Sequence, residues 1–143
     1  MPDPQSLPTW QVPGSLEINA GHLTVDGVDA TRLAQQYGTP LFVFSEQRIA
    51  NNIRNLRSAV ESVHPLVKIC YASKPHSNMS ILVALRPPGG DIEVNSGGEL
   101  FKAVKIGFRP DQIVFNGVSK TEREIQDAID YGILAINIDS LKS

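Results

Sequence analysis

Residues 91–107 read DIEVNSGGELFKAVKIG, and this stretch decides the fold class. The sequence predicts a strand over residues 91–95 and a helix over residues 99–106, closed by a glycine. Ser96 and Glu99 between them have the S-x-x-E spacing of a capping box, which marks the first turn of a helix. The stretch is therefore one strand followed by one capped helix.

The same alternation continues on both sides of this unit. The expected strands are residues 40–44, 67–73, 113–115 and 134–138, and the expected helices are residues 49–63, 79–85 and 121–131. Apolar residues recur every three or four positions in the first of these helices, which gives it one buried face. Short connections between alternating strands and helices require parallel strands, because each helix carries the chain back across the sheet. The predicted fold class is α/β.

The N-terminal part has a different character. Four prolines fall within residues 1–15, a density that disfavours helices and strands, so we expect a loose leader. Residues 16–28 predict a small hairpin with its turn at residues 19–21. Residues 30–37 predict a short helix that ends at Gly38.

Composition excludes several classes of function. The 13 Lys and Arg against 15 Asp and Glu give a net charge of −2, without a basic run, which disfavours nucleic acid and anionic membranes as partners. The apolar stretches are too short to span a bilayer. No signal peptide is visible and the single Cys70 cannot form an internal disulfide, so we expect a cytoplasmic protein.

Lys74 is the main candidate for chemistry. Side chains alternate along a strand, so Cys70, Ala72 and Lys74 share one face, with the lysine at the carboxyl end. This end of the strands is the functional face of βα architectures, where a desolvated amine condenses with a carbonyl to form a Schiff base. The alternative is a solvated lysine at a strand end.

The segment around Ser96 supplies candidates on the same rim. Glu93 could contact a cationic substrate, and Gly97 and Gly98 allow close approach of a ligand to the backbone. The alternative is a capped helix without a ligand. His76 could shape the rim, or it is solvated surface. The sequence contains neither a metal-ligand spacing nor a nucleotide phosphate loop.

Three motifs in order resemble the fold-type III pyridoxal-phosphate (PLP) decarboxylases, the diaminopimelate and ornithine decarboxylase family. Residues 70–78, CYASKPHSN, are similar to that family's Y-A-x-K-A-N-x-N. Residues 93–100, EVNSGGEL, resemble its D-V-x-S-G-G-E-L, and residues 113–120, IVFNGVSK, its I-x-F-x-G-x-x-K. Residues 137–140, NIDS, are similar to its V-D-S strand end. The resemblance covers residues 38–143.

This resemblance implies a PLP site at the mouth of a (β/α)8 barrel of the alanine racemase type. Lys74 matches the lysine that holds PLP as an internal aldimine, and Ala72 the small residue beneath the ring. Glu93 matches an acid near cofactor and substrate, and Glu99 and His76 stand near the substrate. The implied reaction is PLP-dependent decarboxylation of a diamino or basic amino acid. Glu93 is one methylene longer than the family's aspartate, and residues 75 and 76 are Pro-His instead of Ala-Asn.

Length sets the expected domain layout. A (β/α)8 barrel takes about 250 residues, so residues 39–143 correspond to its first half, truncated after about four barrel strands, behind the leader (1–15) and the hairpin with its helix (16–38). A full-length protein is expected to be a homodimer. Two alternatives stay open: a fold-type III amino-acid racemase, and a barrel fragment that is inactive without a partner polypeptide.

Overall fold

The structure is a computed structural model, and it describes residues 11–140. The chain divides into two compact units, Met1–Arg48 and Ile49–Ser143. Most of the leader expected over residues 1–15 lies outside the described residues.

The first unit contains a small antiparallel sheet and one helix. Its elements are β1 (Leu16–Asn19), β2 (His22–Val25), β3 (Val28–Asp29) and α1 (Ala30–Tyr37). β1 pairs with β2 through a turn at Ala20 and Gly21, both of which have positive φ angles, and β2 pairs with β3. The hairpin and the short helix predicted from the sequence are therefore confirmed.

The strand predicted over residues 40–44 is absent. Residues 41–44 pair with no strand, and their hydrophobic side chains are exposed, Phe42 by 87%. A β-prone sequence becomes a strand only where a neighbour supplies ladder hydrogen bonds and a surface to pack on. Within the described residues this segment has no neighbouring strand, and the chain passes directly into α2 (Glu46–Glu61).

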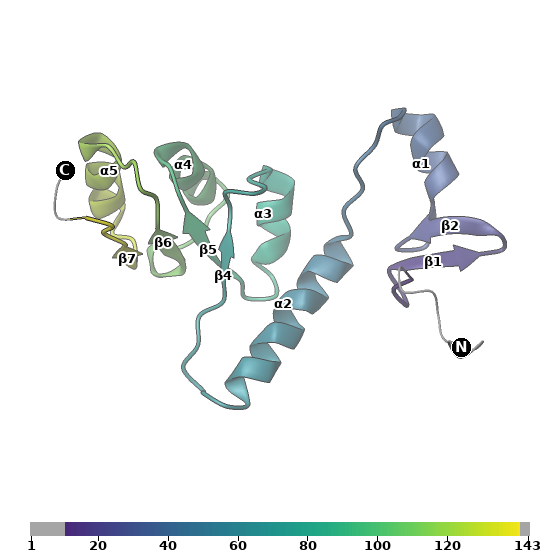
Figure 1. The fold of residues 1–143 in the computed structure, drawn as a ribbon, viewed down its shortest axis with the longest axis horizontal. Helices are drawn as coiled ribbons and strands as arrows, with labels where there is room; N and C mark the ends of the chain where they lie inside the picture. Colours follow the sequence, from purple (N-terminus) through teal and green to yellow (C-terminus); the bar gives the residue numbers. More distant parts are fainter. Residues whose placement is uncertain (1–10, 141–143) are drawn as a thin grey trace. The chain divides into compact units, whose positions relative to one another are not determined.

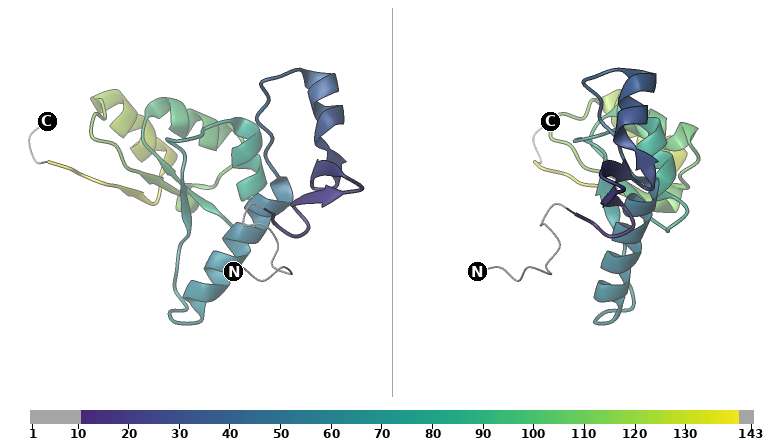
Figure 2. Two further views of the ribbon diagram at one scale, coloured as in Figure 1. Left: turned by 45° about the vertical axis from the view of Figure 1, so that its right-hand side comes forward. Right: turned by 90° about the vertical axis from the view of Figure 1, so that its right-hand side faces the viewer.

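The second unit alternates strands and helices, as predicted. After α2 come β4 (Cys70–Ala72), α3 (Met79–Leu85), β5 (Asp91–Val94), α4 (Gly97–Lys105), the 3-10 helix η1 (Pro110–Gln112), β6 (Ile113–Phe115), α5 (Glu122–Tyr131) and β7 (Ala135–Ile136). The strands form one sheet in the order β4-β5-β6-β7, and all neighbours are parallel (Figure 1). Figure 2 shows these elements from two further sides.

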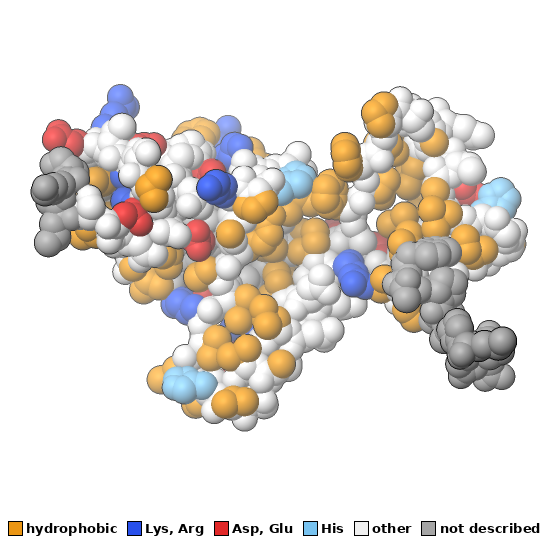
Figure 3. All heavy atoms as spheres, in the orientation of Figure 1, with side chains coloured by type: hydrophobic (Ala, Val, Ile, Leu, Met, Phe, Trp, Pro, Cys, Tyr) orange, Lys and Arg blue, Asp and Glu red, His pale blue; other side chains and the backbone are white. Residues whose placement is uncertain are grey.

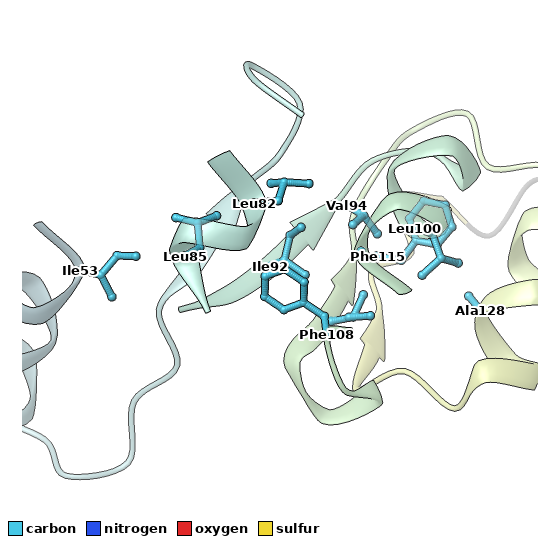
Figure 4. Packing of buried hydrophobic residues seen from close by; sticks show 11 residues of the cluster. Ile53, Leu82, Leu85, Ile92, Val94, Leu100, Phe108, Phe115 and Ala128 are labelled. Atoms are coloured by element: carbon cyan, nitrogen blue, oxygen red, sulfur yellow. The ribbon is translucent and has the colours of Figure 1, made fainter. Parts of the chain in front are cut away.

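The core of this unit lies between the sheet and its helices. Ile92, Val94, Ile113 and Phe115 on the central strands are fully buried, and Leu82, Leu85, Leu100 and Ala128 on the helices pack with them (Figure 4). α2 adds Ile53 to this cluster. The opposite face of the sheet carries the alternate residues, which stand in register across the four strands: Ala72, Glu93, Val114 and Ala135.

The edge strands are shorter than predicted, whereas the central ones agree closely. β4 covers only residues 70–72 of the expected 67–73, and β7 only residues 135–136 of the expected 134–138. β4 and β7 are the edge strands, so each pairs with one neighbouring strand only. The residues at the ends of the predicted segments therefore lack hydrogen bonds from a second strand. α4 begins at Gly97, two residues before the predicted start, because Ser96 is its N-cap.

Hydrophobic side chains are also exposed on this unit. Figure 3 shows hydrophobic side chains on the surface around the lower end of α2. Leu56 within α2 is 52% exposed, and Val63, two residues after the helix, is 86% exposed. α2 therefore contributes to the core through Ile53 and leaves its C-terminal end open to solvent. No helix within residues 11–140 is long and apolar enough to cross a membrane.

Candidate functional site

Lys74 and three asparagines stand in one row at the carboxyl ends of the strands. Each of them comes two residues after one of the four residues that stand in register across the sheet. The pairs are Ala72 and Lys74, Glu93 and Asn95, Val114 and Asn116, and Ala135 and Asn137. Backbone hydrogen bonds from Ser73 to Glu93, Asn116 to Val94 and Asn137 to Phe115 continue the ladder to this level. Lys74 itself lies in a turn, two residues after the end of β4, at the same end of the sheet as the amides.

An open pocket of about 500 Å³ lies at this end of the sheet. It is lined by Lys74, Asn95, Glu99, Asn116, Gly117, Val118, Ser119 and Asp139. Lys74 is exposed, so its amine can reach a small molecule from solution. The structure therefore brings together two of the predicted site residues, Lys74 and Glu99.

Glu99 has fixed partners within the site. Its Oε2 accepts a hydrogen bond from the backbone N–H of Asn95 at 2.9 Å and contacts the hydroxyl of Ser73. The Glu99 N–H donates to the N-cap Ser96 Oγ at 3.3 Å, which is half of the predicted capping box. The other half differs, because the carboxylate reaches past the N-cap to Asn95.

Glu93 lies one level deeper and holds the two amides. Its Oε1 accepts from Asn95 Nδ2 at 3.3 Å and from Asn116 Nδ2 at 3.1 Å. An ionised carboxylate only accepts hydrogen bonds, so both amide nitrogens face it and both amide oxygens remain available as acceptors. Glu93 itself is not among the residues that line the pocket.

Gly97 is needed for protein packing. A Cβ at this position would lie 2.7 Å from Cγ of Glu124, and the Gly97 N–H donates to Glu124 Oε1 at 2.6 Å. A side chain therefore occupies the space that the sequence offered to a ligand at Gly97. At Gly98 the nearest atom to a Cβ is Ser96 Oγ, at 3.9 Å, so the space there is open.

Glu124 thus joins the first turns of α4 and α5. It also completes a capping box, accepting from the Thr121 N–H at 2.9 Å while its own N–H donates to Thr121 Oγ1 at 3.3 Å. The backbone N–H groups of Thr121 and Gly97, followed by the Thr121 hydroxyl, lower the pKa of Glu124. Its negative charge is therefore stabilised at the same end of the sheet as Lys74.

The loop after β6 is held against the end of β5. Gly117 has φ +153°, and a Cβ there would lie 2.5 Å from the backbone oxygen of Asn95. Lys120 donates to the carbonyl of Gly117 and pairs with Asp139 at 3.4 Å, with a side chain only 8% exposed. The buried ammonium of Lys120 therefore binds groups of the protein itself, whereas Lys74 is exposed to solvent.

Two predicted site residues lie elsewhere. Ala72 lines a different groove at the open edge of β4. His76 is not among the residues that line the Lys74 pocket, and its carbonyl accepts a hydrogen bond from the Tyr71 hydroxyl at 3.1 Å. Burial raises the pKa of the Cys70 thiol, which favours the packing interpretation of that residue over a nucleophile.

Sequence reasoning missed several pocket residues. Asn95, Asn116 and Asp139 were present in the quoted motifs and were not singled out as site residues. Counting two positions onward from Glu93 and Val114 would have found both asparagines. The contacts of Ser73 and Glu124 had no sequence signal, because they join residues 26 and 27 positions apart.

No group of three or more His, Cys, Asp or Glu side chains within the described part of the chain could hold a metal ion. The pocket itself offers one exposed amine, that of Lys74, beside hydrogen-bond acceptors and the carboxylates of Glu99 and Asp139.

Comparison with known proteins identifies the family. Residues 47–143 match the sequence model for "Pyridoxal-dependent decarboxylase, pyridoxal binding domain". The chain is 39% identical over 126 residues to a diaminopimelate decarboxylase of Methanothermobacter thermautotrophicus, and 41% identical over 125 residues to that of Aquifex aeolicus. Both alignments cover 87% of this chain and 29% of the relative.

A solved structure gives the same result. The diaminopimelate decarboxylase of M. jannaschii in complex with L-lysine superposes with a TM-score of 0.79 at 38% identity, over 88% of this chain and 30% of that one. The chain thus spans about a third of the length of its relatives, and its α/β fold is that of part of a PLP decarboxylase barrel. The chain belongs to the pyridoxal-dependent decarboxylase family, and it matches the pyridoxal binding domain of that family.

Proposed function

We propose that this chain carries the cofactor lysine of a PLP-dependent decarboxylase that acts on a diamino or basic amino acid. The observation that supports it best is the exposed amine of Lys74 in a pocket at the carboxyl ends of the parallel strands. Lys74 is the residue of this chain that would form the covalent link to PLP. The relatives from M. thermautotrophicus and A. aeolicus are diaminopimelate decarboxylases, which supports a diamino acid as the substrate class.

The residues present fit this cofactor. The amine of Lys74 is accessible, and the pocket of about 500 Å³ that it lines leaves space beside it. PLP, when bound, supplies an electron sink for the loss of the substrate's carboxylate as CO2. Lys74 would hold the cofactor covalently through its primary amine.

The other residues would bind and orient the substrate. The amide oxygens of Asn95 and Asn116, directed away from Glu93, would accept hydrogen bonds from a substrate ammonium group. Glu93 and Glu99 add negative charge, which favours a cationic substrate over an anionic one. His76 is proposed to act near the substrate and Ala72 beneath the cofactor ring, both on the resemblance alone.

The same proposal includes the domain layout and the oligomeric state. Residues 16–38 are proposed as an N-terminal segment and residues 39–143 as the first part of the barrel. The full-length protein is proposed to be a cytoplasmic homodimer, which sedimentation analysis would test.

Borohydride reduction in the presence of PLP tests the attachment. The 143-residue chain is incubated with PLP, reduced and digested, and the modified lysine is located by mass spectrometry. We expect modification at Lys74 at low PLP concentration and its loss in Lys74→Arg. Equal modification of Lys74 and of exposed Lys105 would overturn the assignment, because it would show only general amine reactivity.

The reaction is tested with the longest naturally encoded polypeptide that contains this sequence. CO2 release and change of chirality are measured with diaminopimelate, lysine and ornithine. We expect CO2 release. Racemisation without CO2 would favour the racemase alternative and contradict the proposal. Parallel assays of the 143-residue chain, with and without the remaining polypeptide, test whether it needs a partner polypeptide for activity.

A further inference from the structure

Ser73, the residue directly before Lys74, is fully buried at the end of β4. Its N–H donates to the carbonyl of Glu93 at 3.0 Å, as the ladder requires. Its hydroxyl lies within hydrogen-bonding distance of two acceptors, the same carbonyl at 2.9 Å and Oε2 of Glu99. A buried hydroxyl therefore links the backbone of the lysine strand to an acid of the pocket.

The hydroxyl has one proton, and donation to the carboxylate is favoured. Both neighbouring oxygens are acceptors, so Ser73 can donate to only one of them at a time. A hydrogen bond to a charged acceptor is about twice as strong as one to a neutral carbonyl. With the Asn95 N–H at 2.9 Å, Oε2 of Glu99 then has two donors from the protein.

Glu99 and Lys74 line the same pocket, yet they form no ion pair among the described residues. An exposed lysine next to a mobile carboxylate would be expected to pair with it and hold its proton more tightly. The other acids near the pocket have partners of their own, since Asp139 pairs with Lys120 and Glu93 holds two amides.

We propose that Ser73 is a positioning residue that holds the Glu99 carboxylate away from Lys74 and so keeps the lysine amine available for reaction. This inference rests on the proposed function of Lys74. It assigns to Glu99 a carboxylate that hydrogen bonds hold in one place. It also explains why a hydroxyl is buried where an apolar side chain would fill the same space. Loss of the hydroxyl leaves Glu99 with one anchor and allows it to approach the ammonium.

Labelling kinetics test this proposal without any cofactor. The 143-residue chain is acetylated with an N-hydroxysuccinimide ester at pH 8, and the rate at Lys74 is divided by the rate at exposed Lys105. We expect Ser73→Ala to slow relative labelling of Lys74 about three-fold, because an ion pair at an exposed site has a modest effect on protonation. The pH at which labelling reaches half its maximum should rise accordingly.

The decisive comparison is the double variant. Ser73→Ala with Glu99→Gln should restore the wild-type rate, because the released side chain no longer carries charge. Ser77→Ala is the matched control: it removes a hydroxyl from the same loop, one that accepts from Lys102 of α4 at 2.8 Å and not from Glu99, and should leave the rate unchanged.

Two results would overturn the inference. Unchanged labelling in Ser73→Ala, with its fold verified by amide NMR spectra, would show that Ser73 does not restrain Glu99. Slow labelling that persists in the double variant would assign the effect to a loosened strand. Ser73→Cys, which keeps the branching and length of the side chain approximately and weakens the donor, replaces Ser73→Ala if that variant fails to fold. PLP attachment at Lys74 can succeed or fail independently of either result.

Discussion

The two units of this chain use the same local signals and differ in what those signals organise. The first unit has a hairpin turn and the helix α1, which Asp29 caps, at the predicted places. The second unit has the helix α5, which Thr121 caps. The second unit adds a cluster of fully buried side chains, whereas α1 has no buried residue. Turns and N-caps thus set where helices and strands begin and end. The buried core of the second unit holds together the strands whose ends form the Lys74 pocket.

The largest contrast is expected from side-chain truncation in the two sheets. Phe115→Ala removes a fully buried ring from β6 and should lower the free energy of unfolding by about 3–5 kcal/mol. Ile18→Ala in β1, where the side chain is 48% exposed, should cost less than about 1 kcal/mol. Urea unfolding with hydrogen exchange measures both, and equal costs would contradict the assignment of the core to the second unit.

Glycine replacement gives the next contrast. Gly117→Ala places a Cβ 2.5 Å from the Asn95 backbone oxygen at φ +153°, so the loop must shift, at a cost of about 2–3 kcal/mol. Gly21→Ala has φ +82° and no atom within 4 Å of the new Cβ, so only backbone strain of about 1 kcal/mol is expected. Thermal unfolding ranks the two, and the reverse order would show that the loop at Gly117 moves away from Asn95 without cost.

These contrasts show what sequence could predict. Strand and helix order in the second unit, the register that places Lys74 at a strand end, and the N-caps Ser96 and Thr121 all follow from local patterns. Such features depend on residues a few positions apart, whose geometry is fixed by the helical and strand repeats.

The features that sequence could not predict depend on distant residues. The segment 41–44 has β-prone composition but no strand neighbour, so its pattern alone was misleading. The Ser73–Glu99 and Gly97–Glu124 contacts arise only when parallel strands bring successive helix starts together. Tertiary packing therefore gave Glu99 and Gly97 partners that their capping and glycine signals did not reveal.

Removal of a helix cap should have a smaller effect. Thr121→Ala removes the side chain that accepts from the Glu124 N–H at 3.3 Å, and should cost about 1 kcal/mol. Asp29→Ala removes the cap of α1, where Asp29 Oδ1 accepts from the Thr31 N–H at 2.6 Å. We expect loss of helix signal confined to α1 in that variant, measured by amide exchange. Loss of protection in β4–β7 would contradict the division into units.

The smallest effect concerns pH and Glu124. Hydrogen bonds from Thr121 and Gly97 lower its pKa from the ordinary value of 4.5, so the folded state binds its proton less readily than the unfolded state. This contribution to stability is complete above that ordinary value and is lost as the pH falls through the lower value of the folded state. Glu124→Gln should therefore flatten the acid limb of the stability curve, measured by urea unfolding from pH 6 to pH 3. Glu122→Gln, an exposed change in the same turn, is the control and should retain the wild-type slope. An equal flattening in both variants would assign the effect to the charge of the helix terminus, and the specific link between α4 and α5 would then contribute nothing measurable to acid stability.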